Sequence, residues 1–129
     1  MKANKTKEEK LLELRFWFES NGKKYTDFQE NKVYRAILEA IDRRNYEDFL
    51  PIDIVQDITE YHPGVIEELR NELDKSFVER SIGSHLKQMT LRSILEIKGE
   101  KPSVRQKVFG IDSDVVDEVT QYIKNLLNR

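Results

Sequence analysis

The 129-residue sequence predicts a mainly α-helical fold with one small β-hairpin, which places the protein in the α+β class. Two observations lead to this prediction. Over most of the chain, apolar residues recur at the i, i+4 spacing that gives a helix one buried face. From Arg92 the pattern changes to two β-rich runs around "GEKP" in "SILEIKGEKPSVRQKVFGI", which is typical of a hairpin with a long basic tip.

Composition restricts the class of protein further. Hydrophobic residues make up 38% and charged residues 36% of the chain, with both signs well mixed, as in a soluble globular domain. No apolar run approaches the roughly 18 residues that a membrane span needs, and the N-terminus lacks the apolar stretch of a signal peptide. The absence of cysteine excludes disulfides, thiolate metal ligands and a cysteine nucleophile. We therefore expect a cytoplasmic protein without membrane contact.

The first two helices are indicated by a cap and by a periodic stripe. Thr6 and Glu9 have the spacing of a capping box before an apolar stretch, so a helix is expected from about Thr6 to Ser20. A second helix is expected from about Thr26 to Arg44. Its buried face would consist of Val33, Tyr34, Ile37, Leu38 and Ile41.

The middle of the chain is expected to contain shorter helices separated by turns. "NYEDFLP" is predicted to be a short extended connector, because the residue before Pro51 favours the β or polyproline region. A third helix should run from about Ile52 to Tyr61, and "HPG" at 62–64 predicts a turn. The remaining helices are expected in the acidic "VIEELRNELDK", from Ser76 to Met89, and, after the hairpin, from about Ser113 to Asn128.

The helix from Ser76 to Met89 should have one apolar and one polar face. At about 100° per residue, the buried stripe comprises Val78, Ile82, Leu86 and Met89, with His85 at its edge. The opposite face comprises Arg80, Ser84 and Lys87, flanked by Ser81 and Gln88. Gly83 lies beside this polar face, although glycine costs a helix about 1 kcal/mol relative to alanine. Its small size predicts the close approach of another backbone, either that of DNA or that of the preceding helix.

The order of these elements carries a resemblance to a known family. A helix, a short extended strand, two further helices and a hairpin follow one another, and "VERSIGSHLKQMTLRSILEIKGEKPSVRQKVFGI" resembles the recognition helix and wing of winged helix-turn-helix DNA-binding domains. It is similar in particular to the C-terminal winged helices of plasmid- and phage-type primase–helicase proteins. Those domains have an Ile-Gly-x-x-Leu helix, here Ile82 to Leu86, and a basic hairpin with an aromatic-Gly-hydrophobic end, here Phe109 to Ile111. The resemblance covers residues 51–111 and implies a winged helix with extra N- and C-terminal helices.

The function that this resemblance implies is non-catalytic binding of double-stranded DNA. The helix at 76–89 would enter the major groove, and the wing at 92–111 would lie along the backbone or the minor groove. Segment 76–111 carries a net charge of +4 and the rest of the chain −6, which favours salt-sensitive phosphate contacts there. The expected DNA-binding residues are Arg80, Ser81, Ser84, Lys87, Gln88, Arg92, Lys98, Lys101, Arg105 and Lys107. The protein would be a transcription or replication regulator, or the DNA-positioning domain of a larger primase or helicase.

A protein–protein interaction module is the alternative function. The sequence pI is about 5.8, and Glu67, Glu68 and Glu72 would repel phosphate if they faced the groove. Lysines at a hairpin tip can also serve only to keep a strand edge from pairing with another chain. An enzyme is not expected, because no phosphate-binding glycine loop, nucleophile elbow or zinc-ligand spacing is present. We accordingly expect no cofactor and no metal, and both His62 and His85 are interpreted as non-ligands.

The terminal helices raise the question of a second copy. The sequence divides into an N-terminal helix (1–25), a winged-helix domain (26–111) and a C-terminal helix (112–129). Apolar residues surround most of the N-terminal helix, so it must be covered on several sides. These residues are Leu11, Leu12, Leu14, Phe16, Trp17 and Phe18. Either the two terminal helices pack on each other or they pair with those of a second copy, and a homodimer would favour a palindromic DNA site.

Overall fold

The computed structural model describes residues 5–19, 32–72, 78–104 and 106–128. Within these ranges the chain is mainly helical with one two-stranded antiparallel sheet, which confirms the predicted α+β class. The elements in chain order are α1 (Lys7–Glu19), α3 (Lys32–Arg43), α4 (Pro51–Tyr61), α5 (Pro63–Glu72), α6 (Val78–Leu91), β1 (Leu95–Lys101), the 3-10 turn η2 (Pro102–Val104), β2 (Gln106–Ile111) and α7 (Val116–Leu127).

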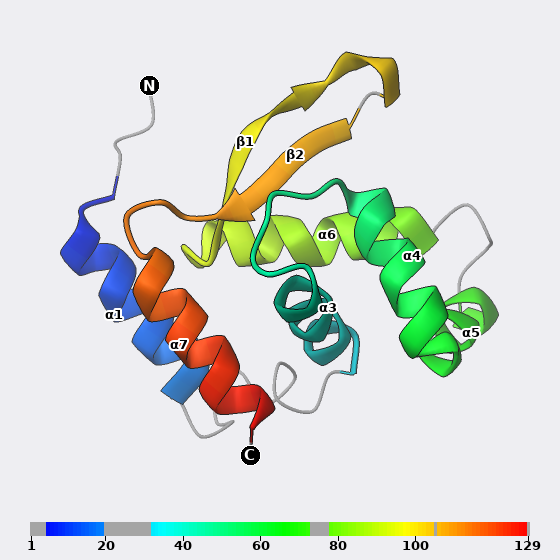
Figure 1. Cartoon of the computed structure of the whole chain (residues 1–129), viewed down its shortest axis with the longest axis horizontal. Coiled ribbons are helices and arrows are strands. Elements are labelled where there is room, and N and C mark those ends of the chain that lie inside the picture. Colours follow the sequence, from blue (N-terminus) through cyan, green and yellow to red (C-terminus); the bar gives the residue numbers. More distant parts are fainter. Residues whose placement is uncertain (1–4, 20–31, 73–77, 105, 129) are drawn as a thin grey trace.

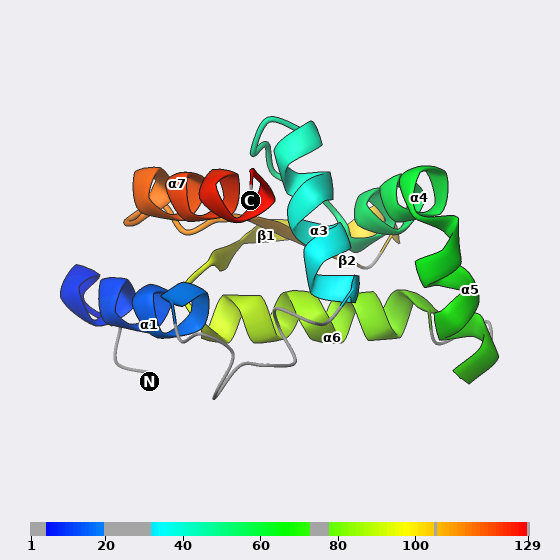
Figure 2. The same cartoon turned by 90° about the horizontal axis from the view of Figure 1, so that it is seen from below.

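Helix α6 crosses the molecule behind α3 and α4, and the hairpin rises from its C-terminal end (Figure 1). Seen from below, α5 lies at the N-terminal end of α6, while α1 and α7 run side by side at the other end (Figure 2). The outward side of α6 is therefore the side that neither α3 nor α4 covers.

The core lies where α3, α4 and α6 meet and extends to the terminal helices. The buried stripe of α6 is the one expected, since Val78, Ile82, Leu86 and Met89 are all buried. From the other elements, the largest fully buried side chains are Leu14, Ile37, Leu38, Ile41, Ile54, Ile58, Ile94, Leu95 and Ile123. One core cluster thus joins residues from α1 to α7.

The connector between α3 and α4 lies along the hairpin. Phe49 and Phe109 exchange two backbone hydrogen bonds of 2.8 Å, and their rings stack with centroids 6.2 Å apart. Leu50 is extended, as predicted for the residue before Pro51. β2 is therefore paired on both sides, by β1 and by the one-residue bridge at Phe49.

Helix α1 begins with the predicted capping box. The Thr6 amide donates to Glu9 Oε1 (3.2 Å), and the Glu9 amide donates to Thr6 Oγ1 (3.1 Å). Further along, Lys10 binds both Asp112 and Asp114 in the loop before α7, at 3.0 and 2.7 Å. This three-residue clamp fixes the start of α1 against the junction between the hairpin and α7.

Both predicted turns are displaced. At "HPG" the turn is only one residue long, because α4 ends before His62 and α5 begins after it, at Pro63. Proline is tolerated at the first position of a helix, since the backbone N–H that it lacks would have no partner within the helix there. At "GEKP" the strand β1 continues through Lys101. A β-bulge at Lys98 shifts the register, so that Gly99 pairs with Val108 and the turn falls at 102–104. Residues 20–31, 76 and 77, where ends of predicted helices fall, lie outside the described residues.

Candidate nucleic-acid interface

The outward face of α6 is the polar face that the sequence predicts. Arg80, Ser84, Lys87 and Gln88 are exposed, and Ser81 is half-buried. Because the inward stripe is fully packed, rotation of the helix about its axis is not available, and these side chains must point away from the core. The face therefore offers hydroxyl, amide and cationic groups on a rigid 14-residue helix.

Gly83 borders this face and has open space in front of it. No atom of the described residues lies within 4 Å of the position that a Cβ would occupy. The sequence offered two reasons for a small residue at position 83, the approach of DNA or the approach of the preceding helix. Within the described part of the chain, no helix packs closely against Gly83. Among the described residues, none fills the space in front of Gly83.

One flank of α6 is fixed by His85 and Tyr34. His85 Nδ1 lies 2.6 Å from the Ser81 carbonyl oxygen, and its ring meets the edge of Tyr34 with centroids 4.7 Å apart. Burial raises the pKa of Tyr34, and the charge of Arg92 acts on it in the opposite direction. Arg92 is half-buried directly after α6 and three residues before β1, which is the base of the wing as the sequence predicts, and its charge reaches Tyr34 from there.

Lys98 is engaged in an ion pair on the hairpin. Its ammonium lies 2.5 Å from Glu96 Oε1, and the same carboxylate oxygen accepts the Ser113 amide at 3.1 Å. Partial burial alone would raise the pKa of Glu96, but the bonds from Lys98 and Ser113 outweigh it, so the pKa of Glu96 is lowered. The positive charge of Lys98 is largely compensated, which reduces what this residue can offer a phosphate.

The basic character of the described hairpin is concentrated near its tip. Lys101 and Lys107 are exposed, and Glu100 faces Lys107 across the ladder. Arg105 lies outside the described residues. Of the ten predicted contact residues, the structure brings seven into exposed positions on two adjoining elements, and one of these, Lys98, is paired with Glu96. The other six are Arg80, Ser84, Lys87 and Gln88 on α6, and Lys101 and Lys107 on the hairpin.

Two exposed apolar side chains on these elements were not predicted. Leu91 is 49% exposed and Ile97 is 48% exposed. Leu91 follows Lys87 by four residues and Ser84 by seven, so helical spacing alone could have placed it on the outward face. Strand alternation would instead have placed Ile97 with the buried Leu95, because both lie on one side of a regular strand.

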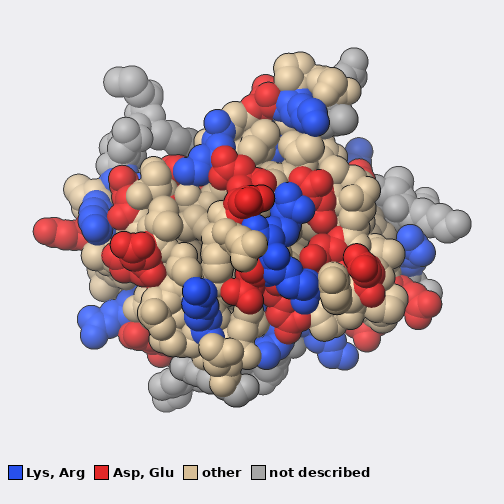
Figure 3. Space-filling model, in the orientation of Figure 1, with Lys and Arg blue, Asp and Glu red and all other residues tan. Residues whose placement is uncertain are grey.

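The opposite side of the molecule has a different charge pattern. Figure 3 shows the face on which α4 and α7 lie in front of α6, and basic and acidic side chains interleave across it. Between α3 or the residue after it and α4, Arg43 pairs with Asp57 and Arg44 with Asp53. Such a surface does not focus a field of one sign. On α5, beside the N-terminal end of α6, Glu67 and Glu68 are exposed, while the Glu72 side chain is outside the described set.

Among the described residues no cluster of three or more His, Asp or Glu side chains is arranged to hold a metal ion. None of the helices in the described ranges combines the length and the apolar character needed to cross a membrane. Comparison of the chain with protein-family models, curated proteins and solved structures finds no match.

Proposed function

We propose that this chain binds duplex DNA without catalysis, with α6 in the major groove and the β1–β2 hairpin against the phosphate backbone. The observation that carries the proposal is the arrangement of these two elements. A helix that is buried on one side and polar on the other leads directly into a hairpin with exposed lysines at its tip. A major groove about 12 Å wide admits such a helix.

The path of the chain supports a winged helix-turn-helix arrangement. The bridge at Phe49 adds a one-residue third strand to the sheet, between α3 and α4, which are the first two helices of the trio α3, α4 and α6. The last helix of the trio, α6, then carries the wing. In this arrangement Ser84, Lys87 and Gln88 would contact base edges, and Lys101 and Lys107 would bind phosphates.

The biological role that fits is a transcription or replication regulator, or a DNA-positioning domain within a primase–helicase. Neither role requires a cofactor at the interface, since the side chains of α6 and the hairpin would themselves donate the hydrogen bonds to bases and phosphates. A cytoplasmic location is consistent with either role.

The test is a salt titration of duplex binding by fluorescence anisotropy, with Lys101→Gln/Lys107→Gln compared to the wild type. Loss of two phosphate contacts is expected to weaken binding and to reduce the slope of log K against log salt by about two. The matched control is Lys7→Gln/Lys124→Gln, which removes two exposed charges from α1 and α7 and should leave both quantities unchanged. Equal effects of the two double variants would contradict the proposed face.

A protein partner is the second candidate, favoured by the exposed Leu91 and Ile97 and by the internal pairing of Lys98. Absence of duplex binding at low salt would select this function over DNA binding. In that case a Leu91→Ser/Ile97→Ser variant is expected to keep its fold and to lose the partner, because both side chains are already half-exposed.

A further inference from the structure

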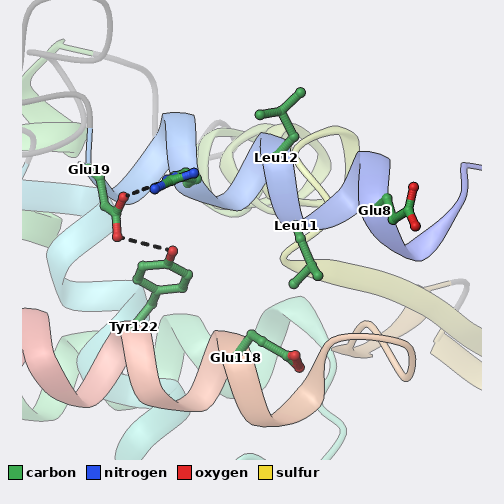
Figure 4. Close-up of a pocket in the computed structure, with 7 residues that line it drawn as sticks. Glu8, Leu11, Leu12, Glu19, Glu118 and Tyr122 are labelled. Atoms are coloured by element: carbon green, nitrogen blue, oxygen red, sulfur yellow. Dashed lines mark hydrogen bonds and ion pairs between the residues drawn. The ribbon is translucent and has the colours of Figure 1, made fainter.

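A groove of about 460 Å³ runs between α1 and α7, away from α6 and the tip of the hairpin. It is lined by Glu8, Leu11, Leu12, Arg15, Glu19, Glu118 and Tyr122. Leu11 points from α1 toward α7, whereas Leu12 points away from α7 (Figure 4). The Tyr122 hydroxyl donates to Glu19 at 3.2 Å and closes one end of the groove.

The open end of the groove is acidic. Glu8 and Glu118 lie there on opposite helices (Figure 4), and no residue in the described ranges forms a hydrogen bond or ion pair with either carboxylate. The single basic residue in the lining, Arg15, is already paired with Glu19 at 3.3 Å. A second hollow continues along α7 and adds Asp117 to the acidic rim. The groove therefore has an uncompensated negative charge.

One exposed apolar side chain lines the groove, and a second follows it along α1. Leu12 belongs to the lining and is 55% exposed, and Phe16, four residues later, is 52% exposed. The sequence predicted that this helix must be covered on several sides, and the described residues bury Leu14, Trp17 and Phe18 and partly bury Leu11, while they leave Leu12 and Phe16 exposed. An apolar strip beside free carboxylates is the complement of a helix that has both apolar and cationic residues.

We propose that the groove between α1 and α7 binds a basic amphipathic helix from a protein partner. Apolar residues of that helix would cover Leu11, Leu12 and Phe16, and a Lys or Arg side chain would lie between Glu8 and Glu118. A second copy of this chain is the poorer occupant, because pairing the same face with itself brings these unpaired carboxylates toward one another. The predicted homodimer through the terminal helices is thus disfavoured on this face.

The test uses a fluorescein-labelled 15-residue helical peptide with leucines at i, i+4 and i+7 and lysines on either side of them. The control peptide has glutamates in place of the lysines. The lysine peptide is expected to bind saturably, and Glu8→Gln/Glu118→Gln is expected to weaken binding by about tenfold, since two charge pairs are lost. Glu47→Gln/Glu67→Gln, which neutralises two exposed carboxylates elsewhere, should bind as the wild type does.

Leu12→Ser provides an independent arm, because this side chain is exposed and its replacement leaves the core intact. This variant should also bind the lysine peptide more weakly, while its far-UV circular dichroism spectrum stays the same as that of the wild type. Failure of the lysine peptide to saturate, or equal binding by the groove and control variants, would overturn the proposal. Analytical ultracentrifugation gives a further outcome that would overturn the proposal. If the chain forms a concentration-dependent dimer that Leu12→Ser abolishes, a second copy fills the groove. Duplex binding by α6 is measured separately and does not depend on this result.

Discussion

Gly83 is the residue at which stability and the proposed function make opposite demands. Glycine disfavours a helix relative to alanine by about 1 kcal/mol, and no described atom would obstruct a Cβ at this position. Packing among the described residues therefore does not explain the absence of a side chain. Under the proposed function the close approach of DNA would explain it, because the position borders the exposed polar face of α6.

The variant Gly83→Ala should separate these two demands. We expect it to raise the free energy of unfolding by about 1 kcal/mol in urea titrations. Duplex affinity should fall at the same time, because the added methyl group holds the helix away from the groove. A variant with raised stability and unchanged affinity would show that DNA does not approach the helix at this position.

Gly110 in β2 is constrained in the opposite way. A Cβ there would lie 2.2 Å from Asp48 Oδ1 and 2.8 Å from Lys98 Cε. Gly110→Ala should therefore displace both side chains, and because both are exposed and flexible the free energy of unfolding should fall by no more than about 1 kcal/mol, the low end of the range for overpacking. Gly99→Ala is the matched control in β1, because no described atom lies within 4 Å of its Cβ position. Similar losses in both variants would point to strand propensity as the cause.

At the scale of elements, the clamp from Lys10 to Asp112 and Asp114 gives a pH dependence. The hydrogen bond to Asp114 is the largest influence, and it raises the pKa of Lys10 in the folded state. A lysine whose pKa is higher in the folded than in the unfolded state stabilises the folded protein. Its full contribution is present when the pH lies below the pKa of that lysine in the unfolded state. This stabilisation is lost as the pH rises through the folded value.

Lys10→Met should lower the free energy of unfolding at pH 7 by about 1–2 kcal/mol, because Asp112 is buried and loses its cation. The difference between wild type and variant is expected to shrink as the pH rises above roughly 10.5. Urea unfolding at pH 7, 9 and 11 measures this difference, with Lys7→Met as the exposed control. A difference that is constant with pH would mean that the clamp contributes through packing alone.

Helices could be predicted at this scale because their signals are local. The capping box of Thr6 and Glu9 and the apolar stripe of α6 depend on spacings of three and four residues, and both are confirmed. Turn positions could not be predicted in the same way. The first three residues of "GEKP" stay in the strand because they pair across the ladder with 106–108, a contact that local sequence does not encode.

The candidate interface was predictable to a similar extent. Helical periodicity correctly assigns the exposed face of α6, since Ser84, Lys87 and Gln88 are exposed. It does not indicate that Lys98 is paired with Glu96 or that Arg92 lies near Tyr34. Both outcomes depend on the bulge and on packing between α3 and α6, which tertiary structure decides.

For the whole molecule, a single core predicts a single unfolding transition. Trp17 of α1 is buried and packs edge-on against Tyr34 of α3, with ring centroids 5.6 Å apart. Trp17 fluorescence and far-UV circular dichroism should therefore report the same midpoint and slope in urea. An earlier fluorescence transition would instead identify the N-terminal helix as a separate unit, in keeping with the boundary at residue 25.

The pairing of α1 with α7 has a consequence for synthesis on the ribosome. Lys10 and its partner Asp112 are 102 positions apart in the chain, and polypeptides are made at about 5–20 residues per second. Helix α1 must therefore wait roughly 5–20 s after its synthesis for α7. During that interval Phe18 lacks Tyr122, on whose ring it stacks with centroids 4.9 Å apart, and its apolar surface is open to a nascent-chain chaperone.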